Sequence, residues 1–283
     1  MITGGLLINK ECGKTSRQEV NEVSHLLHEK KIGHIGTLDP FADGLLIVLV
    51  GRATKLAPFL EGLDKTYLGT LKLGQKTDTA DRDGKVVEEQ PVPTLNVGQI
   101  REILQQFTGD LEQIPPKYSA LKVDGERAYA LARKNVEFEL QKRQIHIFEN
   151  TLINFNGSDE ITFLCRVSKG TYVRTLGEDI AVKLGTVGHL TALSRVKTGE
   201  YSIEQSHKSK DVKEEYLISV DDLLKSYPSE ILQGGDIKKA SNGMRMELKK
   251  HSEKLVLLKD SDGPIAMYER VQGHFYYCLR GLR

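Results

Sequence analysis

The chain lacks several features that mark familiar protein classes. It has no tryptophan and only three cysteines, Cys12, Cys165 and Cys278, among 283 residues. The cysteines are far apart, odd in number and form no C-x-x-C pair, so neither a disulfide framework nor a zinc knuckle is indicated. We therefore expect a cytoplasmic protein in a reducing environment.

Long apolar runs are also absent. No stretch approaches the ~20 apolar residues that a membrane-spanning helix needs, and the N-terminus has neither the basic start nor the cleavage site of a signal peptide. Hydrophobic residues still make up 39% of the chain, which is enough for a sizeable core. We expect a soluble protein that does not bind a membrane.

Neither sign of charge predominates. The chain has 40 Lys or Arg and 39 Asp or Glu residues, so the net charge does not mark a nucleic-acid binder. Residues 229–283 carry 10 basic and 7 acidic side chains, and residues 114–144 carry 7 and 4. An ordinary solvated surface explains these small excesses as well as RNA contact does.

Helical and strand-like patterns are mixed along the chain without a regular β-α-β repeat. Ser16 and Glu19 suggest a capping box at the start of a first helix, and Thr171 suggests the N-cap of a later one that ends near Gly185. Residues 1–225 therefore favour an α+β domain. Strands are expected at 45–50, 67–73, 144–155, 160–168 and 189–196.

Two segments depart from this pattern. Residues 114–142 begin with Pro115-Pro116, carry several basic and tyrosine side chains, and predict an exposed arm that contains a short helix. After the turn-like run that ends at Pro228, short alternating stretches predict a small all-β module over residues 229–283.

Asp39 is the carboxylate with the most informative setting. It lies in the run Gly33-His34-Ile35-Gly36-Thr37-Leu38-Asp39-Pro40, on a tight loop before the apolar strand 45–50. Such a carboxylate can be a nucleophile, a base or a metal ligand, or part of a plain Asp-Pro turn. No cluster with metal-ligand spacing surrounds it, and the loop 77–84 lacks the acids of an EF-hand because positions 79 and 90 are Thr and Gln. We expect no metal.

Other catalytic signatures are missing. There is no G-x-S-x-G motif of a serine hydrolase. The run Gly185-Thr186-Val187-Gly188 is not followed by the Lys-Ser/Thr of a phosphate-binding loop. The sequence therefore offers no support for these two classes of enzyme.

Arg174 falls in the first turn of the helix expected from Val173, where the helix dipole disfavours a cation. An anionic partner, either a phosphate or a buried carboxylate, accounts for this position, unless the side chain only reaches solvent. Tyr67, Tyr118, Tyr129 and Tyr172 lie beside basic or polar residues, a combination that suits stacking on RNA bases but also occurs on ordinary surfaces.

Six ordered blocks of the sequence resemble the bacterial TruB-type tRNA pseudouridine synthases over essentially the whole chain. Some positions differ from the family pattern: Glu11 replaces a Pro, Phe41 and Asp43 stand where Leu and Thr are common, and Lys76 stands for Arg. The blocks are Gly33–Pro40, Lys65–Tyr67, Leu73–Thr79, Gln113–Lys122, Lys169–Thr175 and Leu190–Arg195.

The resemblance implies isomerisation of the uridine at position 55 in the T loop of tRNA to pseudouridine, without a cofactor. It implies a mixed, largely antiparallel sheet in the catalytic domain, a PUA-like RNA-binding domain at 229–283, and an arm at 114–142 that closes on the RNA. The protein is expected to act as a monomer that needs no protein partner.

The resemblance also implies roles for individual residues. Asp39 is the expected nucleophile, Arg174 its ion-pair partner, and Tyr67 the residue that stacks on the uracil and is a candidate base at C5. The further residues expected to contact the flipped nucleotide or its neighbours are His34, Tyr172, Leu193 and Lys122.

Several alternatives stay open at this stage. The carboxylate can attack C6 of the uracil or C1′ of the ribose. Asp43 adds a second carboxylate close in sequence to Asp39, which raises a pKa if the two lie together. The chain can also be an RNA-binding or RNA-folding module without catalysis, or a synthase that depends on a guide RNA and partner proteins.

Overall fold

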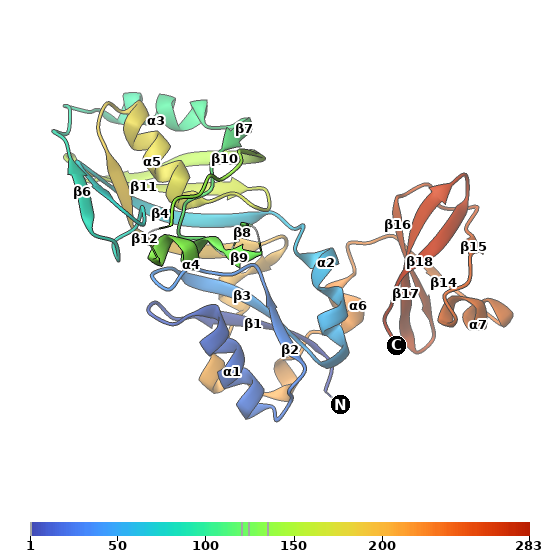
Figure 1. The fold of residues 1–283 in the computed structure, drawn as a ribbon. Helices are drawn as coiled ribbons and strands as arrows, with labels where there is room; N and C mark the ends of the chain where they lie inside the picture. Colours follow the sequence, from blue (N-terminus) through green and yellow to red (C-terminus); the bar gives the residue numbers. More distant parts are fainter. Residues whose placement is uncertain (1, 120, 124, 135) are drawn as a thin grey trace.

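The structure is a computed structural model that describes residues 2–119, 121–123, 125–134 and 136–283. Its larger part is built on a nine-stranded sheet (Figure 1). Two strands lie beside the main path: β2 (Ile32–Ile35) pairs with β3, and β13 (Tyr201–Ser202) pairs with β12. The main path runs β1 (Gly4–Lys10), β3 (Asp43–Val50), β12 (Gly188–Thr198), β4 (Lys65–Leu73), β11 (Glu160–Val167), β10 (Arg143–Phe155) and β7 (Gly109–Gln113).

One pairing in this sheet is parallel. β3 and β12 run side by side in the same direction where Ser194 lies opposite Asp43 and Arg195 opposite Gly44. The other pairings among the described strands of this sheet are antiparallel. The predicted α+β fold with a mixed, largely antiparallel sheet is therefore confirmed.

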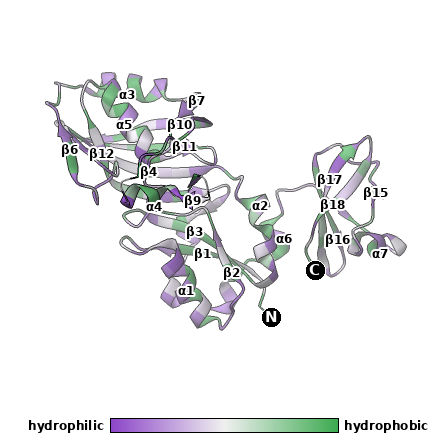
Figure 2. Ribbon diagram, in the orientation of Figure 1, coloured by the Kyte–Doolittle hydropathy of each residue, from purple (hydrophilic) through white to green (hydrophobic). Residues whose placement is uncertain are grey.

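Helices cover the sheet in two places. α3 (Val97–Gln106) and α5 (Val173–Lys183) pack on the half that contains β4, β10 and β11, and α1 (Ser16–Leu26) packs on β1 and β3. Figure 2 shows α1 and α3 with hydrophobic residues on one side and hydrophilic residues on the other. Such helices bury only the side that faces the sheet.

The strand β3 is apolar from Leu45 to Val50 because both of its faces are covered. Leu46 and Val48 pack in one cluster with α1, whereas Leu45 and Ile47 belong to a second cluster on the other face. A strand that is buried on both faces shows a continuous apolar run instead of alternation. This run places the loop before β3, and thus Asp39, on a rigid support.

The first helix is capped one residue earlier than predicted. Thr15 is the N-cap, its side chain accepts a hydrogen bond from the amide of Gln18, and Gln18 completes the capping box. The prediction of a box between Ser16 and Glu19 is wrong, because these two side chains are buried and make tertiary contacts. Ser16 bonds to the backbone of Leu38, and Glu19 accepts a hydrogen bond from the amide of Glu11 at 2.9 Å.

The N-cap of α5 also differs from the prediction. Tyr172, not Thr171, is the N-cap, and it makes no side-chain capping bond. The amide of Tyr172 instead donates to Gln113 Oε1 at 2.8 Å, and Gln113 Nε2 donates to the carbonyl of Tyr172 at 3.1 Å. A tertiary contact thus replaces the local cap. The predicted end of the helix is confirmed, since Gly185 follows the C-cap with φ of +88°.

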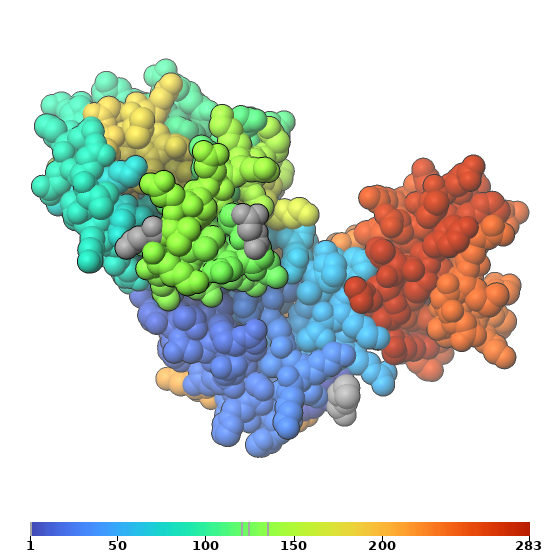
Figure 3. All heavy atoms as spheres, in the orientation of Figure 1, coloured from blue at the N-terminus to red at the C-terminus, as the bar shows by residue number. Residues whose placement is uncertain are grey.

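The arm at 114–142 contains a two-stranded hairpin, β8 (Lys122–Val123) and β9 (Glu126–Arg127), followed by the short helix α4 (Ala128–Arg133). Ala120, Asp124 and Asn135 of this arm lie outside the described residues. In Figure 3 the arm (light green) lies in front of the junction between the N-terminal elements and the rest of the larger part. The predicted short helix is confirmed.

The C-terminal residues form a separate five-stranded sheet with its own apolar core. One short helix, α7 (Gly235–Ser241), packs on it, which the alternating pattern did not indicate. Leu257 and Met267 of this sheet join a cluster with Phe59 and Leu223, so the module also packs on the larger part. Its strands are, in spatial order, β14 (Ser229–Ile231), β16 (Leu255–Asp260), β17 (Gly263–Gln272), β18 (Phe275–Gly281) and β15 (Met246–Glu247).

Short elements complete the fold. No helix within the described ranges is long and apolar enough to cross a membrane. The remaining elements are the hairpin of β5 (Gln75–Thr77) and β6 (Val86–Glu89), the helices α2 (Ala57–Leu60) and α6 (Val220–Leu223), and the 3₁₀ turns Gly51–Leu56, Ile203–Gln205, Ser209–Asp211 and Glu214–Tyr216.

Candidate functional site

The loop that carries Asp39 is held from behind by two buried polar side chains. Ser16 Oγ accepts a hydrogen bond from the amide of Leu38 at 2.9 Å and donates to the carbonyl of the same residue at 3.2 Å. Lys10 Nζ donates to the carbonyl of Ala42 at 2.6 Å and to that of Pro40 at 3.4 Å. The residues on both sides of Asp39 are thus fixed, and its half-exposed side chain projects into a pocket.

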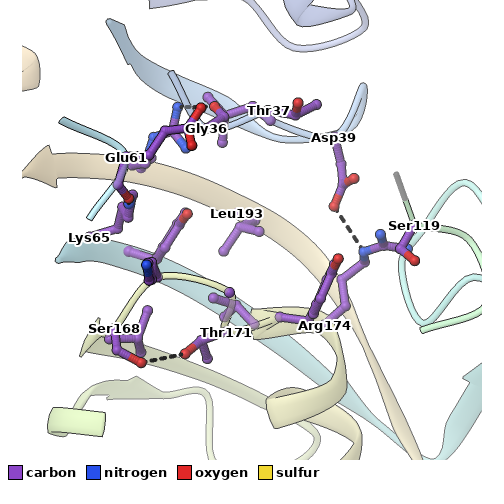
Figure 4. A pocket seen from close by; sticks show the side chains of 18 of the residues that line it. Gly36, Thr37, Asp39, Glu61, Lys65, Ser119, Ser168, Thr171, Arg174 and Leu193 are labelled. Carbon is purple, nitrogen blue, oxygen red and sulfur yellow. Dashed lines mark hydrogen bonds and ion pairs between the residues drawn. The ribbon is translucent and has the colours of Figure 1, made fainter. Parts of the chain in front are cut away.

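Arg174 lies directly against Asp39. Its Nε is 2.9 Å from Asp39 Oδ2, and the arginine side chain is only 4% exposed. Nε makes no well-aligned hydrogen bond, so this contact is an ion pair. The guanidinium is oriented instead by Nη1, which donates to the carbonyl of Thr79 at 2.8 Å, and by Nη2, which donates to the carbonyl of Tyr118 at 2.9 Å. Figure 4 shows Asp39 and Arg174 pointing toward one another from separate elements.

A second carboxylate faces the same guanidinium. Asp81 Oδ2 lies 3.3 Å from Arg174 Nη1, and Asp81 is buried. Thr79 Oγ1 donates a hydrogen bond to Asp81 Oδ1 at 2.6 Å, and the amide of Asp83 donates to the same oxygen at 3.1 Å. Burial raises the pKa of Asp81, while the Thr79 hydrogen bond and Arg174 oppose that rise. Asp81 belongs to the loop 77–84, and nothing local to that loop in the sequence indicates its contact with Arg174.

Strands β4 and β12 form the floor of the pocket. Tyr67 lies opposite Arg195 in the antiparallel register, and Leu193 lies opposite Gly69. Tyr67 and Leu193 both line a pocket of about 830 Å³ that also contains Asp39 and Arg174. An aromatic ring and an aliphatic side chain on the floor are suited to holding a flat ring.

His34 and Tyr172 also line this pocket. Burial lowers the pKa of His34, and Arg17 and Arg195 lower it further, so the imidazole is neutral at pH 7. His34 Nδ1 is buried and has no hydrogen-bond partner among the described residues. Burial raises the pKa of Tyr172, so its phenol keeps its proton.

The structure therefore brings six of the seven residues expected from the sequence to one pocket. The exception is Lys122, which is exposed on β8 and does not line it, although its neighbour Leu121 does. Asp43 is also absent from the lining, because it lies at the start of β3 beside Ser194. Within the described part of the chain, no group of three His, Cys, Asp or Glu side chains is placed to hold a metal ion.

Two further buried cations line the pocket, besides the exposed Arg143 and Lys169, and the sequence does not single them out. Lys65 is 7% exposed and Arg195 is 1% exposed. Both fall within blocks of the sequence that carry the family resemblance, and strand alternation places Lys65 on the same face of β4 as Tyr67. That alternation is the signal that could have identified Lys65.

Comparisons with known proteins match the chain to one family. Residues 24–173 match the family model described as "TruB family pseudouridylate synthase (N terminal domain)", and residues 174–237 match "tRNA pseudouridylate synthase B C-terminal domain". Asp39 and Tyr67 fall in the first match, and Arg174 begins the second.

Similar curated proteins span nearly the whole chain. "tRNA pseudouridine synthase B" of Hydrogenovibrio crunogenus is 41% identical over 262 residues, which cover 92% of this chain and 86% of that protein. The protein of the same name from Mesoplasma florum is 36% identical over 280 residues, covering 99% of this chain and 98% of that protein.

A solved structure shares the fold at low sequence identity. A chain of a Cbf5-Nop10-Gar1 complex aligns with a TM-score of 0.76 and 19% identity, over 99% of this chain and 85% of that chain. Together, the family models, the curated relatives and the common fold show that the chain belongs to the TruB family of pseudouridylate synthases.

Proposed function

We propose that this protein converts uridine to pseudouridine in tRNA, at position 55 of the T loop, with Asp39 as the nucleophile. The observation that carries the proposal is the ion pair of 2.9 Å between Asp39 and the buried Arg174, inside the pocket floored by Tyr67 and Leu193. A nearby guanidinium favours the ionised carboxylate, and the ionised form is the one that can attack carbon. The names of the curated relatives support tRNA as the substrate.

The reaction needs the uracil to leave C1′, turn, and rejoin through C5. Asp39 can form its bond to C1′ of the ribose or to C6 of the ring, and either route regenerates the carboxylate at the end. Tyr67 stacks on the uracil and is the candidate base at C5. No group leaves the RNA, so the reaction is an isomerisation.

The target uridine must be extruded from the RNA to reach this pocket. Unstacking a base costs a few kcal/mol, and stacking on an aromatic side chain recovers about 1–3 kcal/mol. Tyr67 supplies that surface, and His34, Tyr172 and Leu193 contact the flipped nucleotide or its neighbours. Lys122, on the exposed face of the arm, contacts RNA outside the pocket.

We also infer a division of labour along the chain. Residues 1–225 form the catalytic domain, the arm 114–142 closes on the T arm of the tRNA, and residues 229–283 form a PUA-like RNA-binding domain. The separate core of the C-terminal sheet supports this division. The protein acts as a cytoplasmic monomer that needs no cofactor and no protein partner.

Two alternatives make different predictions. A pure RNA-binding or RNA-folding module does not need a charged nucleophile beside a buried arginine. A guide-RNA-dependent synthase modifies its substrate only with partner proteins present. Activity of the purified chain on an RNA without guide or partner distinguishes the proposal from both.

The test is pseudouridine formation on an unmodified tRNA transcript. Asp39→Asn is expected to abolish conversion while the affinity for RNA stays within severalfold, because the variant keeps the shape of the side chain but loses its charge. Asp43→Asn is the matched control, since Asp43 does not line the pocket, and it is expected to keep the wild-type rate within about threefold. Substantial conversion by Asp39→Asn removes Asp39 from the role of nucleophile.

A further inference from the structure

Lys65 and Arg195 form a second cationic end of the pocket. Both approach Gly36, where an added Cβ would lie 3.2 Å from Arg195 Nη1 and 3.8 Å from Lys65 Cε. In Figure 4, Leu193 lies between Lys65 on one side and the pair of Asp39 and Arg174 on the other. The pocket therefore has the nucleophile at one end and two buried cations at the other.

Neither cation forms an ion pair with a described residue, although Glu61, which also lines the pocket, and Asp64 act on Lys65 from a greater distance. Lys65 Nζ donates to the backbone carbonyls of Glu61 and Leu63 at 2.8 and 2.5 Å. Arg195 Nε donates to the carbonyl of Leu45 at 2.7 Å, and Nη2 to that of Gly36 at 2.9 Å. Among the residues that the structure describes, no carboxylate oxygen lies within 4.0 Å of either cation. Arg174, by contrast, faces both Asp39 and Asp81.

Such an arrangement is costly in the free protein. Burying a charge without an ionic partner costs several kcal/mol, and two like charges side by side add repulsion. Burial, with Arg195 as a further cause, lowers the pKa of Lys65 to about 8. The cost is offset if negative charge develops beside these groups during the reaction, because cations already in place stabilise it without rearrangement.

We propose that Lys65 and Arg195 stabilise the negative charge that the uracil ring carries once Asp39 has attacked. This inference rests on the function proposed above. With the ribose at Asp39 and the ring over Tyr67 and Leu193, the far edge of the ring points toward the two cations.

The electron count supports a charged ring on both routes. If Asp39 attacks C1′, its electron pair forms the new C–O bond and the N1–C1′ pair stays on the uracil, spread over N1, O2 and O4. If Asp39 attacks C6, the electron pair of the C5–C6 bond moves onto C5 and O4. On the C1′ route, C5 attacks C1′ and displaces the carboxylate. On the C6 route, the electron pair on C5 forms the bond to C1′ while the N1–C1′ pair passes to N1, and the carboxylate then leaves C6. On both routes the C5 proton passes to a base and N1 takes up a proton. The ring bears one negative charge after Asp39 has attacked and before C5 bonds to C1′, and no oxidant or reductant is needed.

The test compares two substrates and two lysines. Lys65→Met removes one cation and is compared on a T-arm RNA with uridine and on the same RNA with 5-fluorouridine at the target. Fluorine withdraws electrons and stabilises the anionic ring, so the ring then depends less on the protein. Lys72→Met is the control: Lys72 lies on the same strand but is paired with Asp159 and does not line the pocket.

At saturating enzyme, we expect Lys65→Met to lose about 100-fold in the single-turnover rate on uridine, the effect of removing one preorganised charged donor. On 5-fluorouridine the loss of the N-glycosidic bond should slow by only about 10-fold, and the affinity for either RNA should stay within about twofold. Lys72→Met should match the wild type on both substrates. Lys65→Arg keeps the charge and should recover most of the rate.

Equal rate losses of Lys65→Met on the two substrates overturn the inference, and so does a loss of RNA affinity without a loss of rate, which is the signature of a phosphate contact. A wild type that makes no pseudouridine refutes the proposed function instead. Replacing Lys65 by methionine leaves no buried charge without its ion-pair partner, although the carbonyls of Glu61 and Leu63 lose a donor. A folded variant is expected, and its thermal unfolding checks this.

Discussion

Arg174 donates a hydrogen bond from Nη2 to the backbone carbonyl of Tyr118 at 2.9 Å. Tyr118 lies near the start of the arm 114–142, and the same guanidinium lies 2.9 Å from the carboxylate of Asp39. One side chain therefore contacts both the nucleophile and the segment that we propose closes on RNA. Displacing the arm changes the position of the charge that faces Asp39.

The first prediction concerns the shape of this cation. Arg174→Lys keeps the charge but cannot donate to Thr79 and Tyr118 while facing both Asp39 and Asp81, because an ammonium lacks the planar fork of a guanidinium. We expect the single-turnover rate to fall by at least about 100-fold with little change in RNA affinity. Arg166→Lys is the control, since Arg166 forms a half-exposed ion pair with Asp64 at 3.0 Å. Similar rate losses in both variants would show that the reaction does not depend on the planar guanidinium of Arg174.

The second prediction separates the support of the Asp39 loop from the capping of its neighbouring helix. Ser16→Ala removes the hydroxyl that binds both backbone groups of Leu38. It should lower the free energy of unfolding by about 1–3 kcal/mol, the cost of unsatisfied buried groups, and lower the rate by about 10-fold or more through misplacement of Asp39.

Thr15→Ala is the matched control for that variant. It removes the cap of the same helix and should lower the free energy of unfolding by about 1 kcal/mol, but it should leave the rate unchanged. Denaturant unfolding and single-turnover rates measure the two effects. If the rate follows stability in the same way for both variants, Ser16 has no positioning role.

The third prediction tests the junction between β3 and β12. Gly44 has φ of +102°, and a Cβ there would lie 2.4 Å from the carbonyl oxygen of Arg195. Gly44→Ala should therefore lower the free energy of unfolding by at least about 2 kcal/mol, from backbone strain and the clash. A Cβ added at Gly33 would have no atom within 4 Å, so Gly33→Ala should change the free energy of unfolding by less than about 1 kcal/mol. Equal effects would contradict the close approach of the two strands.

The fourth prediction is a pH dependence of stability. Burial, the main cause, and Arg195 lower the pKa of Lys65 from 10.5 to about 8 in the folded protein. Between these two values the unfolded chain binds more protons than the folded one, so the free energy of unfolding should rise with pH through this window. Below about pH 8 the buried charge destabilises the fold.

The comparison with Lys65→Met isolates this effect. Denaturant unfolding at pH 7.5 and above should show a rise in the wild type that the variant lacks. The other charges that act on Lys65, namely Arg195, Asp64, Glu61 and Lys169, remain in the variant. A parallel pH dependence in both proteins would mean that Lys65 keeps its proton throughout.

Much of the fold could be predicted because its signals are local. Both faces of β3 are buried, and its apolar run shows this directly. The alternation of β4 and the helical spacing from Val173 are equally plain. The N-caps of α1 and α5 could not be predicted, because tertiary contacts decide both. Thr15 and Ser16 are both competent caps of α1, and the buried contact of Ser16 with Leu38 leaves Thr15 to cap. At α5, the hydrogen bonds between Tyr172 and Gln113 replace a local cap.

By itself, the sequence determined most of the elements, the loop that presents Asp39 and, through six ordered blocks, the family. The tertiary structure alone decided which charges meet. Asp81 reaches Arg174, and Lys65 lies beside Arg195, because strands and loops far apart along the chain converge on one pocket. Ion pairs and buried cations depend on distances of a few ångströms between such segments, and no local pattern of residues encodes those distances.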